Sequence, residues 1–216
     1  MLVKWHGHAC FEIVLENGFT IALDPHDGVS LGLKPPAFKA DLILVSHPHF
    51  DHNAVHVVKK NGSIVLESFI GEKRVNNVIV KGIQSYHDPS GGILRGRNTI
   101  YLVQSEGLRI AHLGDLGHLL DTNIVNQLKP LDLLLIPVGG TFTISPREAW
   151  DLTKILQPKI TIPMHYKIPG LNLPLAPVDE YLNRVEYTVK KFNTNQVVLE
   201  KNKLPKESEV WVLKPP

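Results

Sequence analysis

Histidine and aspartate side chains that could bind metal ions follow four apolar segments of the chain. These segments are LILVSHPHFDH, VKGIQSYHD, LRIAHLGD and KITIPMH. Their metal-capable residues are, in chain order, His47, His49, Asp51, His52, His87, Asp115 and His165. Loops that leave the ends of strands are where rigid scaffolds place reactive side chains. We therefore expect the four segments to meet at one rim of the fold.

The spacing within His47-x-His49-x-Asp51-His52 is the most specific pattern in the sequence. Alternate positions point the same way, so His47 and His49 can reach one cation, while the next turn directs Asp51 and His52 to a neighbouring point. Imidazole and carboxylate ligands suit Zn, Mn or Fe, and a catalytic site leaves one coordination position to water. Cys10 is the only cysteine, which excludes an internal disulfide and a thiolate cluster.

Each candidate ligand also has an ordinary structural explanation when it is taken alone. The His47–His52 segment could be a solvated polar turn, and His87 could be a loop residue that faces solvent. Asp115 could be a turn residue, and His165 could be a buried, hydrogen-bonded histidine. The set as a whole favours a metal site, because all these features would otherwise have to coincide.

Composition limits the class of protein. The chain has 216 residues, of which 43% are apolar and 20% charged, so it can bury a core and is not disordered. The formal net charge is +2 without a long run of one sign, so nucleic-acid binding is not expected. No apolar run approaches the roughly 20 residues of a membrane span, and histidines stand where a signal peptide would be apolar. We expect a soluble cytoplasmic protein.

The elements that must position these residues are mainly strands. Hydrophobic patterning and turn residues predict strands at 2–5, 11–15, 19–23, 41–45, 63–66, 78–83, 99–103, 108–111, 196–200 and 210–213. Helices are predicted at 121–129, 145–156 and 177–191; in the second, Ser145 can cap, Pro146 takes the first helical position and Glu148 completes a capping box. The order predicts a layered α/β sandwich with two β-rich halves, about 1–106 and 107–216, and outer helices.

The ordered set of motifs resembles the metallo-β-lactamase superfamily over the whole chain. The resemblance rests on the His47–His52 motif, His87, Gly114-Asp115 and Pro163-Met164-His165. Trp5-x-Gly7-His8-Ala9, Asp24-Pro25 and the 137–143 stretch are similar to its small stand-alone branch of predicted metal-dependent hydrolases. The resemblance implies a single domain, 1–216, with a four-layer αββα sandwich.

The resemblance also implies the arrangement of the ligands. His47, His49 and His87 would bind one metal, Asp51, His52 and His165 the other, and Asp115 would bridge them. Two Zn²⁺ per chain are expected, with Mn²⁺ or Fe as possible substitutes. A hydroxide that bridges the metals would cleave an ester, lactone, thioester or phosphodiester, with Asp51 also steering its proton. Five neutral imidazoles and two carboxylates leave such a site positive, which favours a small anionic substrate.

Several departures narrow the function within the superfamily. The chain has no export signal and no cysteine in the slot of Asp115, which argues against a secreted β-lactamase. It lacks the further histidine motifs of RNA-processing members and is too short for the flavin domain of diiron flavoproteins. A mononuclear-iron oxygenase of the same fold, which uses fewer protein ligands, and a non-catalytic metal- or nucleotide-binding protein remain as alternatives. The oligomeric state is open, and an oligomer is compatible with the sequence.

Other residues are candidates for supporting the metals or contacting the substrate. His8 and Asp24 follow early strands and could orient ligands. Gly140 and Thr141 follow the apolar segment LDLLLIPV, and backbone N–H groups there could bind an oxyanion. His118 could donate a proton from its place three residues after Asp115, and Lys167 could contact an anion. Surface or turn roles are the alternatives for each of these residues.

Overall fold

Fourteen strands form two sheets in the computed structural model, which describes residues 1–216. The first sheet has the order β13-β1-β2-β3-β4-β5. Its strands are β1 (Leu2–Trp5), β2 (Phe11–Val14), β3 (Thr20–Leu23), β4 (Ala40–Val45), β5 (Lys59–Glu67) and β13 (Gln196–Val198). The pairs β1–β2 and β2–β3 are antiparallel, whereas β3–β4 and β4–β5 are parallel. β4 therefore pairs with a strand on each side, β3 and β5.

The second sheet has the order β12-β14-β11-β10-β9-β8-β7-β6. Its strands are β6 (Gly71–Val75), β7 (Val78–Tyr86), β8 (Arg97–Ser105), β9 (Leu108–His112), β10 (Leu133–Pro137), β11 (Ile160–Met164), β12 (Thr188–Lys191) and β14 (Glu209–Val212). β9, β10 and β11 are parallel neighbours. β7 is antiparallel to β8, which is antiparallel to β9, so β7 runs the same way as β9. The carboxyl ends of β7, β9, β10 and β11 consequently lie at one edge of this sheet.

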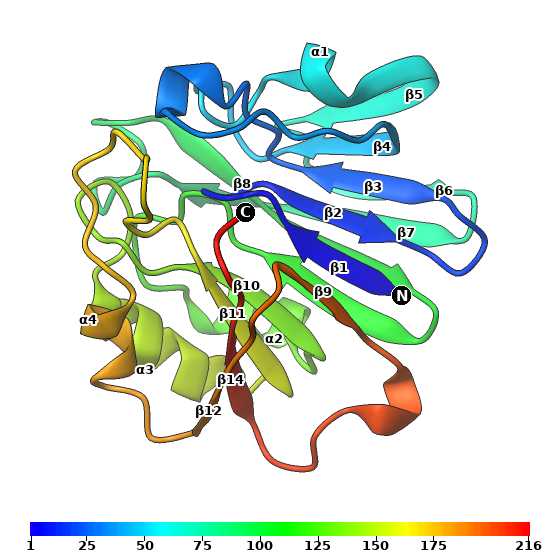
Figure 1. The fold of residues 1–216 in the computed structure, drawn as a ribbon. Coiled ribbons are helices and arrows are strands. Elements are labelled where there is room, and N and C mark those ends of the chain that lie inside the picture. Colours follow the sequence, from blue (N-terminus) through cyan, green and yellow to red (C-terminus); the bar gives the residue numbers. More distant parts are fainter.

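Helices cover the outer faces of the two sheets. The one-turn helix α1 (Val55–Val58) lies against β4 and β5 at one side of the molecule, and α2 (Thr122–Leu128), α3 (Pro146–Leu156) and α4 (Asp179–Leu182) lie at the opposite side (Figure 1). Short 3₁₀ turns are found at Val29–Leu31 and Lys201–Lys203. The expected mixed α/β sandwich is confirmed. The helical layer on the first sheet is thin, because it consists of the one-turn helix α1. No helix is long and apolar enough to cross a membrane.

The side chains of β4 show why its sequence is apolar throughout. Leu42 and Leu44 belong to a cluster of 52 buried apolar residues that includes side chains of both sheets. Ile43 and Val45 point to the other face, where they form a smaller cluster with Val58 of α1. Successive strand residues point to opposite faces, so a strand that is buried on both faces needs an uninterrupted apolar run. The prediction of a doubly covered strand at 41–45 is confirmed.

The chain passes from the first sheet to the second well before residue 106, where the two β-rich halves are predicted to divide. The chain changes sheet between β5 and β6, so β6, β7 and β8 pair with strands that follow residue 107. β8 and β9 are joined by a tight turn at Glu106-Gly107, and both turn residues have positive φ. A two-residue turn of this kind keeps its strands adjacent in one sheet.

The predicted helix at 177–191 is wrong in its extent. Only Asp179–Leu182 is helical, and Thr188–Lys191 forms β12, which pairs in parallel with β14. The segment carries adjacent β-branched residues, Thr188 and Val189, which favour a strand. Pairing with β14 therefore outweighs the local helical pattern.

The predicted capping box at the start of α3 is confirmed. The Ser145 hydroxyl accepts a hydrogen bond from the backbone N–H of Glu148, at 3.2 Å, and the Glu148 carboxylate accepts one from the backbone N–H of Ser145, at 2.8 Å. Pro146 occupies the first helical position. These contacts satisfy backbone donors that a helix leaves unpaired at its N-terminus. They fix the point at which the loop after β10 turns into α3.

Replacing Ser145 by Ala should lower the free energy of unfolding by about 1 kcal/mol, because an N-terminal backbone donor loses its acceptor. Chemical denaturation of the two proteins measures the difference. Ser145→Thr keeps the hydroxyl and is the matched control, for which we expect most of the stability to be retained. Equal midpoints for wild type and Ser145→Ala would contradict a stabilising cap.

Candidate metal centre

The seven predicted ligands come together where the two sheets meet. His47, His49, Asp51 and His52 lie on the loop that follows β4 in the first sheet. His87 and His165 come directly after β7 and β11 of the second sheet, and Asp115 lies shortly after β9. Six of the seven are buried, and His49 is half-buried. The sequence-predicted set is thus gathered from four strand ends.

Hydrogen bonds between the sheets hold these strand ends together. The Tyr101 hydroxyl of β8 lies 3.0 Å from the carbonyl of Val45 and 2.8 Å from that of Leu66, at the ends of β4 and β5. The backbone N–H of Thr99 donates to the carbonyl of Ser46, at 2.9 Å. These bonds fix the start of the ligand-bearing loop against the second sheet.

A glycine allows His87 to approach the loop that carries Asp115. A Cβ added to Gly117 would lie 2.3 Å from the carbonyl carbon of His87, which is closer than any side chain can come. The Gly117 backbone N–H also donates to the carbonyl of Tyr86, at 2.9 Å. Close backbone packing therefore places Asp115 beside His87.

The candidate ligand atoms form three groups: two of them hold six of the seven predicted ligands, and the third combines Asp24 with His47 and His52 of those two groups. In one group, formed by His47, His49 and His87, one atom of each residue lies within 4.8 Å of those of the others. The same holds for a second group, which comprises His8, Asp51, His52 and His165. His8 is the one member of this group that is absent from the ligand set implied by the resemblance.

Asp115 lies between the two groups. One carboxylate oxygen, Oδ2, is 3.1 Å from Nε2 of His87 in the first group and 3.2 Å from Nε2 of His165 in the second. The other oxygen, Oδ1, is 3.2 Å from Nε2 of His52. A single carboxylate therefore contacts both groups of imidazoles.

Several of these buried atoms have no hydrogen-bond partner. They are Nε2 of His47, Nε2 of His52, both ring nitrogens of His165, Nδ1 of His87 and Oδ1 of Asp115. An unsatisfied buried polar group costs about 1–3 kcal/mol, and such groups are rare in folded proteins. Orphaned imidazole nitrogens gathered around an orphaned carboxylate oxygen are the donor set that divalent metal ions take. The residues present therefore fit a metal centre.

Asp24 and Ser46 orient two of the imidazoles. The Asp24 carboxylate accepts hydrogen bonds from the Ser46 backbone N–H, at 2.7 Å, the Ser46 hydroxyl, at 2.6 Å, and Nδ1 of His52, at 2.8 Å. Nδ1 of His47 lies 2.8 Å from the Ser46 hydroxyl. Both rings thus use Nδ1 for support and keep Nε2 free as a ligand. Burial alone would raise the pKa of Asp24, but the neighbouring His52 and His112 rings lower it, so the carboxylate is ionised.

His8 connects two members of the second group. Its Nε2 lies 3.0 Å from Oδ2 of Asp51, and its backbone carbonyl accepts from the N–H of His165, at 3.1 Å. Trp5 donates its indole N–H to the same carbonyl, at 3.0 Å. Burial, together with the His165 ring, lowers the pKa of His8 to about 3, so the ring is neutral at neutral pH. A neutral ring can donate Nε2–H to the Asp51 carboxylate.

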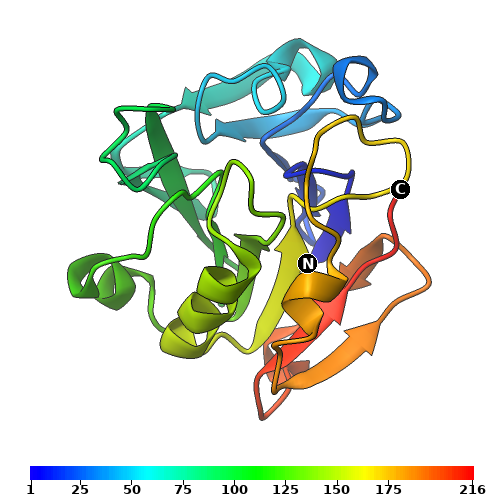
Figure 2. The ribbon, with the colours of Figure 1, turned by 90° about the vertical axis from the view of Figure 1, so that its left-hand side faces the viewer.

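The candidate metal centre opens into a cavity of about 360 Å³. Four of the seven predicted ligands line it: His49, Asp51, His87 and Asp115. The other lining residues are one cation, Arg95, and four apolar side chains, Phe50, Leu94, Phe142 and Leu173. The segment 165–176 after β11 arches from the second sheet towards the loop 24–36 (Figure 2), where Asn172 donates its backbone N–H to the carbonyl of Leu31, at 2.9 Å. This segment supplies Leu173 as one wall of the cavity.

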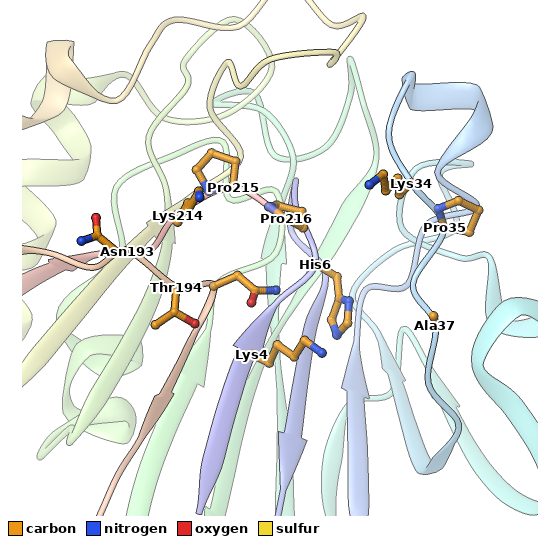
Figure 3. Close-up of a pocket in the computed structure, with 11 residues that line it drawn as sticks. Lys4, His6, Lys34, Pro35, Ala37, Asn193, Thr194, Lys214, Pro215 and Pro216 are labelled. Carbon is orange, nitrogen blue, oxygen red and sulfur yellow. The ribbon is translucent and has the colours of Figure 1, made fainter.

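A larger hollow of about 660 Å³ lies elsewhere, between β1, the 34–37 loop and the C-terminal segment (Figure 3). Lys4, Lys34 and Lys214 line it, and none of the seven predicted ligands does. His6, which also lines it, bonds to Glu12 at 2.8 Å. The smaller cavity is therefore the one with metal-binding chemistry.

The remaining predicted residues do not line the metal-centre cavity. Both ring nitrogens of His118 are used by backbone groups, those of Tyr86 and Leu119, and Lys167 donates its ammonium to carbonyls of the 171–173 segment. Thr141 is exposed and donates to the carbonyl of Pro174, at 2.8 Å. Gly140, with a φ of +61°, forms the turn before Phe142. The polar side-chain atoms of His118, Lys167 and Thr141 are thus hydrogen-bonded to nearby backbone groups. These residues, like Gly140, shape the loops around the site.

Sequence reasoning missed Ser46, Arg95 and the apolar walls. A hydroxyl residue between a strand and the first ligand was a local signal for Ser46. Arg95 lies on a loop with three glycines, Gly91, Gly92 and Gly96, and no pattern in the sequence indicates where that loop folds.

Comparison with known proteins identifies relatives of this chain. The family described as beta-lactamase superfamily domain matches residues 2–165. A UPF0173 metal-dependent hydrolase from Thermococcus onnurineus is 32% identical over 189 residues, which cover 76% of this chain and 84% of that protein. One from Caldivirga maquilingensis is 34% identical over 188 residues, covering 76% and 81%.

A solved structure is similar over the entire chain. It is the crystal structure of a proposed Zn-dependent hydrolase of the metallo-β-lactamase superfamily from Thermotoga maritima. That protein is 37% identical to this chain, and the two structures superpose with a TM-score of 0.80 over 100% of this chain and 99% of the other. The family match, the relatives and the fold agree with the ligand motif: the chain belongs to the metallo-β-lactamase superfamily.

Proposed function

We propose that this protein is a metal-dependent hydrolase with two divalent cations per chain. His47, His49 and His87 would hold one cation, Asp51, His52 and His165 the other, and Asp115 both. The observation that carries the proposal is the set of buried, partnerless ligand atoms on either side of the Asp115 carboxylate. Relatives named as metal-dependent hydrolases support the same activity.

Divalent cations held by these residues would activate a water molecule as the nucleophile near neutral pH and would polarise the scissile group. The ligands suit Zn²⁺, and Mn²⁺ or Fe would also be accepted. Cys10 is buried, and burial raises the pKa of its thiol, so it takes no part. We propose an ester, lactone, thioester or phosphodiester of a small anionic compound as the substrate.

The protein groups have distinct roles in this scheme. Asp24 accepts the Nδ1 proton of His52, and this bond leaves Nε2 facing Asp115 as the atom that would bind a cation. His8 donates to Oδ2 of Asp51 and thereby fixes the carboxylate that would also steer the proton of the attacking water. Burial alone would raise the pKa of Asp51, but the His52 and His8 rings lower it, so this carboxylate stays ionised and can accept that proton's hydrogen bond.

Two separate groups of ligand atoms favour a dinuclear centre over a mononuclear-iron oxygenase. Elemental analysis of the purified native protein tests this directly. We expect about two equivalents of divalent metal per chain, and chelation should abolish cleavage of anionic esters or phosphodiesters until metal is restored. A single iron per chain would favour the oxygenase. Full binding of metal without any turnover on such a panel would favour the non-catalytic alternative.

Loss of the shared carboxylate should affect both cations. We expect Asp115→Asn to weaken metal binding by at least about 100-fold, the upper range for loss of a group that only supports a ligand. Calorimetric titration of the chelated protein measures the change. Asp121→Asn is the matched control, because Asp121 is an exposed carboxylate that caps α2 away from the site. Metal binding that is equally tight in Asp115→Asn and wild type would contradict a ligand role for Asp115.

Substitutions of His8 separate a supporting role from ligation. His8→Gln keeps an N–H near the position of Nε2 but offers no imidazole to a cation, whereas His8→Ala removes the donor. If His8 orients Asp51, His8→Gln should bind two metals like wild type, and His8→Ala should bind one of them about 10- to 100-fold more weakly. Equal loss in both variants would show that His8 is itself a ligand.

Metal binding should release protons at neutral pH. In the metal-free protein, burial would lower the pKa of His52, but the carboxylates of Asp115, Asp51 and Asp24 outweigh it and hold that pKa well above 6.5. A cation must displace this proton, whereas His47, whose pKa burial lowers to about 3, has none to lose. Affinity should therefore fall as the pH is lowered from 7 to 6.

Titration calorimetry of the chelated protein in two buffers with different ionisation enthalpies measures this release. The difference in the apparent binding enthalpies gives the number of protons, and we expect at least about one per chain at pH 7. Identical binding enthalpies in the two buffers, with no pH dependence of affinity, would contradict the protonated state of His52.

A further inference from the structure

Arg95 lines the metal-centre cavity, and its guanidinium has no acidic partner. It is half-buried, lines the cavity with His49, His87 and Asp115, and forms no ion pair and no side-chain hydrogen bond. The guanidinium carbon lies 5.6 Å from the centroid of the Phe142 ring. By contrast, the guanidinium of Arg109 bonds to the backbone carbonyls of Gln127, Leu128 and Pro130.

The backbone that carries Arg95 is held in place. The Asp88 carboxylate accepts four backbone hydrogen bonds, from Ser90, Gly92, Leu94 and Arg95, at 2.8 to 3.1 Å. The His87 N–H also donates to the carbonyl of Gly96, at 3.0 Å, which closes the loop on a predicted metal ligand. Arg95 is thus presented on a rigid loop, and rigid presentation lowers the entropic cost of binding a ligand group.

The other walls of the cavity are apolar. Phe50 and Leu94 line it and are 59% and 68% exposed, and Phe142 and Leu173 complete the lining. Apart from Asp51 and Asp115, which belong to the metal centre, no carboxylate lines the cavity. Large exposed apolar side chains around a concave site are typical of ligand-binding surfaces. The free cation and these apolar walls therefore fit two different parts of one ligand.

We propose that Arg95 binds a second anionic group of the substrate, remote from the bond that is cleaved. The substrate class is then an amphiphilic anion: a hydrocarbon chain or ring that lies against Phe50, Leu94 and Leu173, with the scissile group at one end and a carboxylate or phosphate at the other. A planar guanidinium binds either oxyanion through two parallel N–H groups. The inference rests on the proposed function, because the scissile group must reach the metal centre.

Paired ligands that differ only in the remote group test this assignment. Calorimetric titration of the metal-loaded protein compares straight-chain monocarboxylates with α,ω-dicarboxylates of the same length, from four to eight carbons. Both kinds can place one carboxylate on the metals, but only the dicarboxylates have a second for Arg95. Phosphonocarboxylates of the same lengths form a third arm, which shows whether carboxylate or phosphate is preferred at Arg95.

The variants are Arg95→Ala and Arg95→Lys, with Arg97→Ala as the matched control. Arg97 is exposed, lies two residues further along the chain and does not line the cavity. Wild type and Arg97→Ala should bind a doubly anionic ligand of the right length about tenfold more tightly than its monoanionic partner. Arg95→Ala should lose this preference while binding the monocarboxylate as before, and Arg95→Lys should keep part of it.

Two results would overturn the assignment. In the first, the wild type binds no doubly anionic ligand of any length more tightly than its monoanionic partner. In the second, Arg95→Ala retains the wild-type preference for the doubly anionic ligand. These binding measurements need no turnover, so they are distinct from the hydrolase proposal. A protein that hydrolyses esters but shows no such preference would refute only the role of Arg95. A protein that shows the preference but hydrolyses nothing would refute only the hydrolase.

Discussion

The structure depends on one electrostatic constraint: imidazole and carboxylate groups are packed together in a buried place where protein atoms do not satisfy them. His52 and His165 direct nitrogens at Asp115 from two sides, and no hydrogen bond completes these atoms. Such a cluster would be costly in a metal-free core, because each unsatisfied group has lost its water. Divalent cations would remove this cost by taking the free lone pairs and displacing the proton of His52, so folding and metal binding are expected to be coupled.

The fold brings this cluster together through strand direction. β7, β9 and β11 run the same way, so His87, Asp115 and His165 leave one edge of the second sheet, and Tyr101 fastens the end of β4 against that edge. Supporting residues then determine which atoms can bind a cation. Asp24 and Ser46 hydrogen-bond Nδ1 of His52 and of His47, respectively, which leaves Nε2 of each ring as the ligand atom. His8 hydrogen-bonds both the Asp51 carboxylate and the backbone N–H of His165. The cavity in front combines predicted metal ligands with apolar walls and Arg95, which fits the amphiphilic anion that we propose.

The sequence predicted much of this because metal ligation requires particular residue types at strand ends. The His47–His52 spacing, the apolar run of β4 and the capping box of α3 are local signals, and each has a local physical cause. The structure departs from prediction where tertiary contacts decide: Thr188–Lys191 is a strand because β14 is beside it, and the polar groups of His118 and Lys167 are taken by nearby backbone. Arg95 could not be predicted, because its position depends on how Asp88 folds the loop that carries it.

Anomalous X-ray diffraction from crystals of the native protein, recorded at the absorption edge of the metal found in it, tests the central claim most directly. The account predicts two anomalous peaks separated by roughly 3.5–4 Å, the usual spacing of dinuclear hydrolase centres, one on each side of the Asp115 carboxylate. A single peak, or peaks that Asp115 does not contact, would contradict a shared dinuclear centre.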